Sequence, residues 1–166
     1  MPTVAALRRA RGLGLRAAAL LAFLPPLLTR LVMGQAFYQT GSGKLRNFDN
    51  TVAFFTDLGI PMPELNAAFV SRLELYGGLL LIVGLATRLL AAGLLSTMVV
   101  ALMTADRDGF VQALRGTGEA GLTDVVPFVY LLFLLWLVIA GPGKLSLDAL
   151  LERFLGSEPA PQPATA

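Results

Sequence analysis

Residues 67–88 read AAFVSRLELYGGLLLIVGLATR. This run holds about 20 mostly apolar residues, the length that a helix needs to cross roughly 30 Å of hydrocarbon. It also carries Glu74, three residues before the small pair Gly77 and Gly78. An acidic side chain is costly inside a bilayer and normally faces a partner or a wet cavity. We therefore predict a membrane-spanning helix whose Glu74 face meets another helix.

The composition favours a single membrane domain. The chain has 166 residues, of which 55% are hydrophobic and 14% charged, whereas soluble domains carry about 25% charged residues. The formal net charge is +2, but the basic residues stand at the ends of apolar runs and indicate membrane topology. We expect no nucleic acid partner.

The chain contains no cysteine and no histidine. These residue types supply disulfides, the ligands of iron–sulfur clusters, of haem and of the usual zinc sites, and Ser-His-Asp or Cys-His catalysis. We therefore expect no haem, iron–sulfur or zinc cofactor. If electrons move here, a bound organic cofactor such as a quinone, or a partner subunit, has to carry them.

A basic segment, residues 1–16, precedes the first apolar run, which continues to about Phe37. A cleaved signal peptide is the alternative interpretation. The run extends past Pro25 and Pro26 without a convincing cleavage site, so we expect a retained spanning helix that the two prolines kink near its middle. One stripe of this helix is predicted to face a neighbouring helix: Arg30, Gly34, Phe37, Tyr38 and Gly41.

The chain then turns polar from residue 41 to residue 66. The GSGK sequence of residues 41–44 is too short for a phosphate-binding loop and predicts a flexible turn. Apolar residues at helical spacing over residues 48–58 predict a short amphipathic helix in the membrane surface, with Asn47 as its N-cap.

Two further apolar runs, residues 89–104 and 125–141, complete a set of four. A polar connection with a short helix is expected over residues 106–124. After GPGK, Ser146 can cap a second surface helix. The tail, residues 156–166, has no apolar pattern and is expected to be disordered.

These runs predict an all-α fold, a bundle of four transmembrane helices with short amphipathic interfacial helices, over residues 17–155. The arginines of residues 1–16, together with Arg88, Lys144 and Arg153, place both termini in the cytoplasm. The two longer loops then face outward.

The expected depth of Arg30 in the membrane suggests that it is the partner of Glu74. Arg30 lies about nine residues before the expected outer end of the first helix and Glu74 about seven residues after the start of the second, roughly 14 Å and 10 Å. We predict a buried Arg30–Glu74 pair, with Gln35, Tyr38 and Lys44 above it, as a ligand-binding site. A purely structural pair that fixes helix register is the alternative.

The order of several motifs resembles the DoxX family of small four-helix membrane proteins. The motifs are QTGSGKL, F-x3-LGIP, E-x2-GG-x3-I-x-GLATR and GPGKLSLD, and the likeness runs from about Leu27 to Leu151. The resemblance implies a multi-pass protein of the bacterial cytoplasmic (inner) membrane. Some members are regarded as subunits of a thiosulfate:quinone oxidoreductase, and others as membrane anchors for redox-defence enzymes. The positions that it highlights are Arg30, Gly41, Lys44, Gly59, Pro61, Glu74, Gly77, Gly78, Gly84, Thr87, Arg88 and residues 141–148.

Three functions remain open. The first is a membrane subunit of a redox system that binds a quinone or a similar lipophilic ligand near the Arg30–Glu74 pair, at most one subunit of a quinone-linked oxidoreductase. The second is a non-catalytic scaffold or assembly factor that recruits a partner protein. The third is a small-molecule transporter. This function is the least favoured, because four helices make a thin wall for a pore and the sequence shows no convincing internal repeat. Beyond the lipid bilayer, the expected partners are a redox protein and a second copy of the chain.

Overall fold

The computed structural model describes residues 11–12, 14–15 and 18–156, and these residues form an all-α fold without strands. The expected disordered tail and most of the basic N-terminal segment lie outside the described residues. The helices are α2 (Leu24–Arg46), α3 (Phe48–Asp57), α4 (Pro63–Val83), α5 (Thr87–Met103), α6 (Arg107–Arg115), α7 (Val126–Ala140) and α8 (Leu147–Leu155), with a short 3-10 turn, η1 (Leu122–Asp124), before α7.

The proline pair stands at the beginning of α2 and not in its middle. Pro25 and Pro26 occupy the first turn of the helix, where a missing backbone N–H removes no intrahelical bond. A short helical stretch precedes them, and the whole segment Ala18–Arg46 has 29 residues. The predicted position of the prolines at mid-helix was therefore wrong: they start α2, directly after a break in the helix at residues 22–23.

The predicted turn at residues 41–44 was also wrong, because α2 continues through GSGK to Arg46. Glycine disfavours a helix by about 1 kcal/mol per residue, but Gly41 is buried in the packing between α2 and α4. Tertiary contact outweighs the propensity. The short helix after it is confirmed as α3, although the Asn47 side chain donates to Gly43 O at 3.3 Å and caps no α3 amide.

Helices α2 and α4 pack side by side along glycines. A Cβ added at Gly41 would lie 2.3 Å from Leu75 N, and one added at Gly78 would lie 2.5 Å from Tyr38 N. Only residues without a side chain permit backbones to approach so closely. The predicted stripe of α2 is largely confirmed, because Arg30, Gly34 and other members are buried against α4, whereas Tyr38 is exposed.

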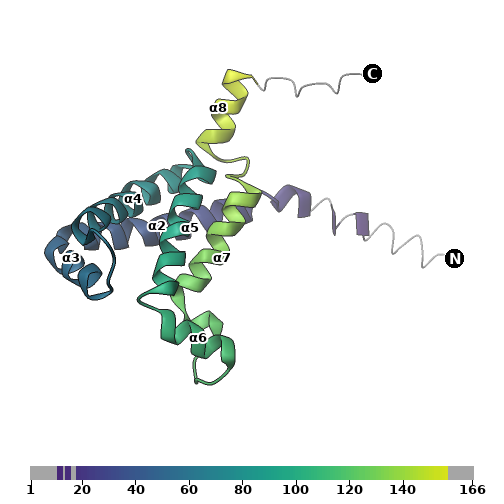
Figure 1. The fold of residues 1–166 in the computed structure, drawn as a ribbon. Coiled ribbons are helices and arrows are strands. Elements are labelled where there is room, and N and C mark those ends of the chain that lie inside the picture. The colour runs from purple at the N-terminus through teal and green to yellow at the C-terminus, as the bar shows by residue number, and fades with distance from the viewer. Residues whose placement is uncertain (1–10, 13, 16–17, 157–166) are drawn as a thin grey trace, which may run out of the picture.

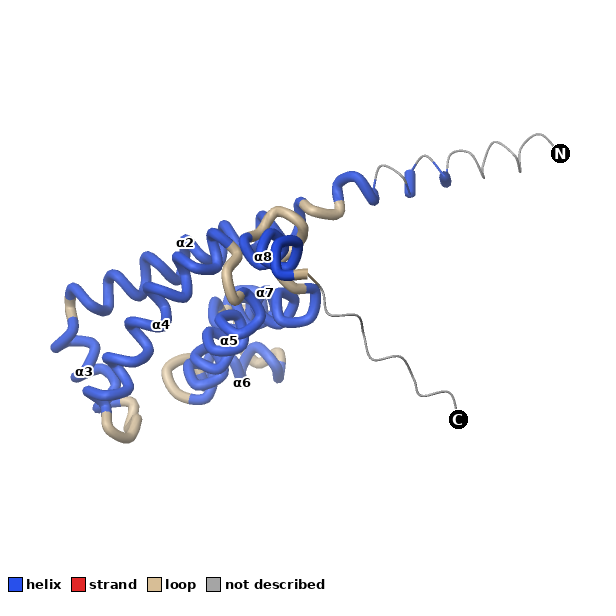
Figure 2. Tube along the Cα trace, turned by 90° about the horizontal axis from the view of Figure 1, so that it is seen from above, coloured by secondary structure: helices blue, strands red, loops and turns tan. Residues whose placement is uncertain are grey.

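Helix α5 packs against α7, and a tight turn connects α4 to α5. Gly84 ends α4 with φ of 74°, a left-handed conformation that glycine adopts without strain. The pairs α2–α4 and α5–α7 meet near this turn and diverge toward α3 and α6 (Figures 1 and 2). The buried apolar core lies where the pairs meet and consists of Met33, Phe37, Leu81, Ala91, Leu94, Leu134 and Leu137.

Two described helices are long and apolar enough to cross a membrane, Ala18–Arg46 and Pro63–Val83. Helix α5 with α6 makes a third span if the two count together, although they are bent by 79° at their junction. Helix α7 is apolar but has 15 residues, about 22 Å of helix. The all-α prediction is thus confirmed, with two to three spans identified by length and composition.

The short polar and amphipathic helices occur where the sequence predicts them. Helix α6 lies in the polar connection, and Ser146 caps α8 by accepting a hydrogen bond from Ala149 N at 3.1 Å. Helix α8 projects from the end of the bundle where α7 finishes (Figure 1). Its apolar side chains are exposed: Leu147, Leu150, Leu151, Phe154 and Leu155.

Candidate ligand-binding site

A cavity of about 220 Å³ opens between α3, α4 and α5, on the side where the two helix pairs diverge. Its wall is mainly apolar, with a few polar groups, among them one acidic and one basic side chain. This combination is typical of sites for small apolar ligands. The lining residues are Lys44, Phe54, Phe55, Leu58, Ile60, Asn66, Phe69, Val70, Glu74, Ser96, Thr97, Met98, Val100, Ala101, Thr104 and Ala105.

Lys44 and Glu74 form an ion pair in this wall, with 2.5 Å between Lys44 Nζ and Glu74 Oε1. The Glu74 side chain is 2% exposed and that of Lys44 31%. Lys44 comes from the last turn of α2, and the close approach at Gly41 brings that turn against the middle of α4. Glu74 is therefore buried in the protein interior, whereas Lys44 is partly exposed.

The second carboxylate oxygen of Glu74, Oε2, is buried and accepts no hydrogen bond from the described part of the chain. A buried acceptor without a donor is unusual, because it has lost its water without gaining a partner. Glu74 thus lines an apolar cavity with one oxygen bound to Lys44 and the other enclosed by the protein.

The predicted Arg30–Glu74 pair does not form, because Glu74 binds Lys44 and Arg30 binds the chain elsewhere. The reason is the register of α2 against α4. Helix α2 ends about seven residues beyond the expected position, and Gly41 lies against Glu74, eleven residues after Arg30 along α2, roughly 16 Å. Arg30 consequently lies beside Gly84, at the far end of α4.

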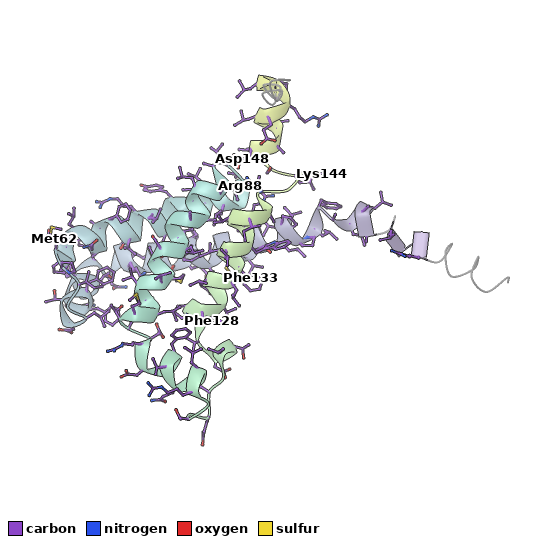
Figure 3. All side chains as sticks on the ribbon, turned by 45° about the vertical axis from the view of Figure 1, so that its right-hand side comes forward. Met62, Arg88, Phe128, Phe133, Lys144 and Asp148 are labelled. Atoms are coloured by element: carbon purple, nitrogen blue, oxygen red, sulfur yellow. The ribbon has the colours of Figure 1, made fainter. Side chains whose placement is uncertain are left out.

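Arg30 belongs to a separate cluster at the α4–α5 turn. Its Nη2 donates to the carbonyl of Leu145, and the side chain is 1% exposed. In the same cluster, Asp148 accepts hydrogen bonds from the backbone N–H groups of Ala86 at 2.7 Å and Thr87 at 2.9 Å. The GPGKLSLD segment thus ties α8 to the helix ends. Asp148, Arg88 and Lys144 lie together at this end, away from Phe128 (Figure 3).

The other predicted ligand-binding residues lie outside the cavity. Gln35 is exposed, and Tyr38 is 40% exposed on α2; neither lines the cavity wall. Of the five predicted residues, the structure brings Lys44 and Glu74 together at the cavity and separates Arg30, Gln35 and Tyr38 from it. The binding of a ligand by any of them stays a prediction.

The apolar wall of the cavity was not predicted from the sequence. The apolar residues at helical spacing over 48–58 were predicted to form a helix in the membrane surface, but α3 packs against α4, and Phe55 of α3 lines the cavity. Thr97 and Ala101 of α5 are spaced by one helical turn and face the same space. That spacing was the available signal, but residues one turn apart share a face on any helix.

No group of three or more Asp, Glu, His or Cys side chains that could hold a metal ion occurs among the described residues. The site is thus a lone carboxylate with a lysine, in an apolar wall.

Comparison with known proteins gives the family. The DoxX family model matches residues 26–107. Inner membrane protein YphA of Escherichia coli (strain K12) is 33% identical over 132 residues, 74% of this chain and 86% of that protein. Uncharacterized membrane protein Rv3486 of Mycobacterium tuberculosis (strain ATCC 25618 / H37Rv) is 33% identical over 139 residues, 78% of this chain and 83% of that protein.

A third relative aligns over a shorter region. "Putative oxidoreductase CatD" of Bacillus subtilis (strain 168) is 33% identical over 78 residues, 47% of this chain and 57% of that protein. No solved structure matches the chain. The apolar helices and these relatives together identify a multi-pass protein of the bacterial inner membrane. The chain belongs to the DoxX family.

Proposed function

We propose that this protein is a membrane subunit of a redox system and binds a quinone or a similar lipophilic ligand in the cavity beside Lys44 and Glu74. The observation that carries the proposal is an apolar cavity with a buried carboxylate, of which one oxygen has no donor among the described residues. The relative named an oxidoreductase supports the redox assignment.

The volume of the cavity limits how much of the ligand it can enclose. Pockets that enclose a whole drug-sized ligand measure roughly 300–1,000 Å³, and this one measures about 220 Å³. A ring-sized polar head fits this volume, and a long apolar tail does not. We propose that the head lies beside Glu74 and the tail passes between the diverging helix pairs to the lipid.

The proposal includes a topology of four spans with both termini in the cytoplasm. In this topology the α4–α5 turn faces inward, and α3 and α6 face outward. The cavity then lies in the outer half of the bundle, and Lys44, near the end of α2, provides a polar route from the outer surface.

The test is native mass spectrometry with lipid extraction on protein purified from its own membrane. We expect a quinone to co-purify with the wild type and to be lost from Ala101→Phe, which fills the cavity from α5 without altering the ion pair. Glu152→Gln, a carboxylate change on exposed α8, is the matched control and should retain the quinone. Absence of bound quinone from every sample, together with no binding of added quinone, would refute the proposal.

A scaffold function is the second candidate, and the exposed apolar face of α8 favours it. A non-catalytic scaffold or assembly factor would recruit a partner protein through such a face. The same purification separates the two functions, because a protein partner without any bound small molecule supports the scaffold.

A further inference from the structure

We infer that a groove between α3 and α4 binds the headgroup of a phospholipid that carries an ethanolamine ammonium, with Arg72 on the phosphate and Glu64 on the ammonium. The inference concerns the lipid around the protein and goes beyond the ligand of the cavity. It depends on α4 as a membrane span, and the binding of a quinone does not enter it.

The groove has a volume of about 680 Å³ and lies between α3 and the first half of α4. Met62, in its wall, lies away from the cluster of Arg88 and Asp148 (Figure 3). The wall combines one cation, Arg72, and one carboxylate, Glu64, with apolar side chains. At the end of a spanning helix, where hydrocarbon meets headgroups, such a mixed wall suits a lipid. The apolar side chains are those of Phe48, Val52, Met62 and Leu65.

Arg72 stands on the face of α4 that is turned toward lipid. Leu65, Phe69 and Tyr76 lie on the same helical stripe as Arg72, and all three are exposed large apolar side chains. Arg72 is itself exposed, within a helix long and apolar enough to cross a membrane. A charged side chain on such a face is costly unless it reaches the headgroups or a partner.

The Arg72 side chain runs toward the beginning of α4, where the headgroups are expected. Its Nη1 donates to Ala68 O at 3.1 Å, one turn nearer to that end. No carboxylate of the described residues lies within ion-pair distance of Arg72. The anion available at this level of a membrane is the lipid phosphate, which a guanidinium binds with two parallel hydrogen bonds.

Glu64 gives the site its preference among phospholipids. It is exposed in the same groove, and about 6 Å of helix separates it from Ala68, where the Arg72 guanidinium lies. An ethanolamine headgroup carries its ammonium on a short chain beyond the phosphate, so one headgroup can meet both side chains. A glycerol headgroup has no cation for Glu64, and the quaternary nitrogen of choline has no N–H to donate.

The experiment measures, by native mass spectrometry, the dissociation constant of the first lipid that binds to the delipidated full-length protein. The probes are phosphatidylethanolamine, phosphatidylglycerol and phosphatidylcholine with identical acyl chains. We expect the wild type to bind phosphatidylethanolamine about threefold more tightly than the other two, the effect of an exposed ion pair. Glu64→Gln should remove this preference. Arg72→Gln should weaken the binding of all three about tenfold, because they share the phosphate.

Arg115→Gln, which removes an exposed arginine from α6, is the matched control and should leave the three dissociation constants unchanged. Binding of phosphatidylglycerol or phosphatidylcholine to the wild type as tightly as phosphatidylethanolamine would overturn the inference. Equal lipid binding by the wild type and Arg72→Gln would overturn it as well. The comparison among lipids uses the wild type alone, so it decides the matter even if a variant does not fold.

Discussion

Two adjacent glycines of α4, Gly77 and Gly78, differ in their surroundings. A Cβ at Gly78 would lie 2.6 Å from Gly34 O, a backbone atom that cannot move aside, whereas a Cβ at Gly77 would make ordinary contact with Leu94 at 3.6 Å. We expect Gly78→Ala to lower the free energy of unfolding by about 1–3 kcal/mol, because α2 and α4 must separate. Unfolding of the purified protein in detergent measures the change.

Gly77→Ala is the matched control in the same helix. Alanine favours a helix over glycine by about 1 kcal/mol, so this variant should be as stable as the wild type or more so. Equal destabilisation by both changes would show that the close approach of α2 and α4 is not what the glycines provide.

The ion pair can be tested for a structural role at the residue level. Lys44→Met leaves the Glu74 carboxylate buried without its partner, and we expect a loss of stability below the about 3–5 kcal/mol of a fully buried broken pair, because Lys44 is partly exposed. Adding Glu74→Met should restore stability, because apolar residues of similar volume often replace a buried pair without cost. Thermal unfolding of both variants measures this.

Ligand retention in the same double variant separates structure from function. If Lys44→Met/Glu74→Met is stable and has lost its quinone, the pair serves the ligand. A stable double variant that still binds quinone would assign the pair to helix register alone.

At the scale of elements, Asp148 joins the beginning of α8 to the beginning of α5. Its carboxylate accepts from Ala86 N and Thr87 N, which have no intrahelical acceptors at this helix end. Asp148→Ala should cost about 1 kcal/mol, the usual effect of losing a cap. We expect amide hydrogen exchange over residues 84–90 to accelerate about fivefold, while Glu152→Gln leaves it unchanged.

Helix α8 is predicted to lie on the membrane surface, because its apolar side chains are exposed and it follows directly from α7. Since the chain has no cysteine, single cysteines can carry spin labels without altering the rest. In liposomes, a label at Phe154 should lie deeper in the lipid than one at Glu152 on the polar face. Equal aqueous exposure of both labels would mean that α8 stands free or binds a protein.

At the scale of the whole molecule, the sequence predicted the all-α class and the order of apolar runs because hydrophobic length and helix caps are local signals. Ser146 and the limits of α7 are examples. The register between α2 and α4 was not predictable in this way. It depends on where α2 ends, and GSGK reads locally as a turn, although Gly41 is held in a helix by its contact with α4.

The error in the register between α2 and α4 also affected the prediction of the candidate site. Glu74 was recognised because a carboxylate in an apolar run is conspicuous by itself. Its partner was misassigned because partners depend on register. Gly41, eleven residues after Arg30, lies against Glu74, and Lys44, about one turn further along α2, binds its carboxylate. The apolar wall could not be predicted from local spacing alone, since it exists only where α3, α4 and α5 meet.

In the proposed topology α7 spans the bilayer, although its 15 residues make it the shortest of the four spanning helices. Single cysteines at Asn50, Thr117 and Lys144, all exposed, can be labelled with a membrane-impermeant maleimide. Asn50 and Thr117 are separated by α4 and α5, and should both react in intact spheroplasts. Lys144 follows α7 and should react only after permeabilisation, because α7 spans the bilayer by local thinning or flanking-residue adjustment. Labelling of Thr117 and Lys144 from one side would show that α7 does not span, whereas labelling of Asn50 and Thr117 from opposite sides would show that α4 and α5 do not both span.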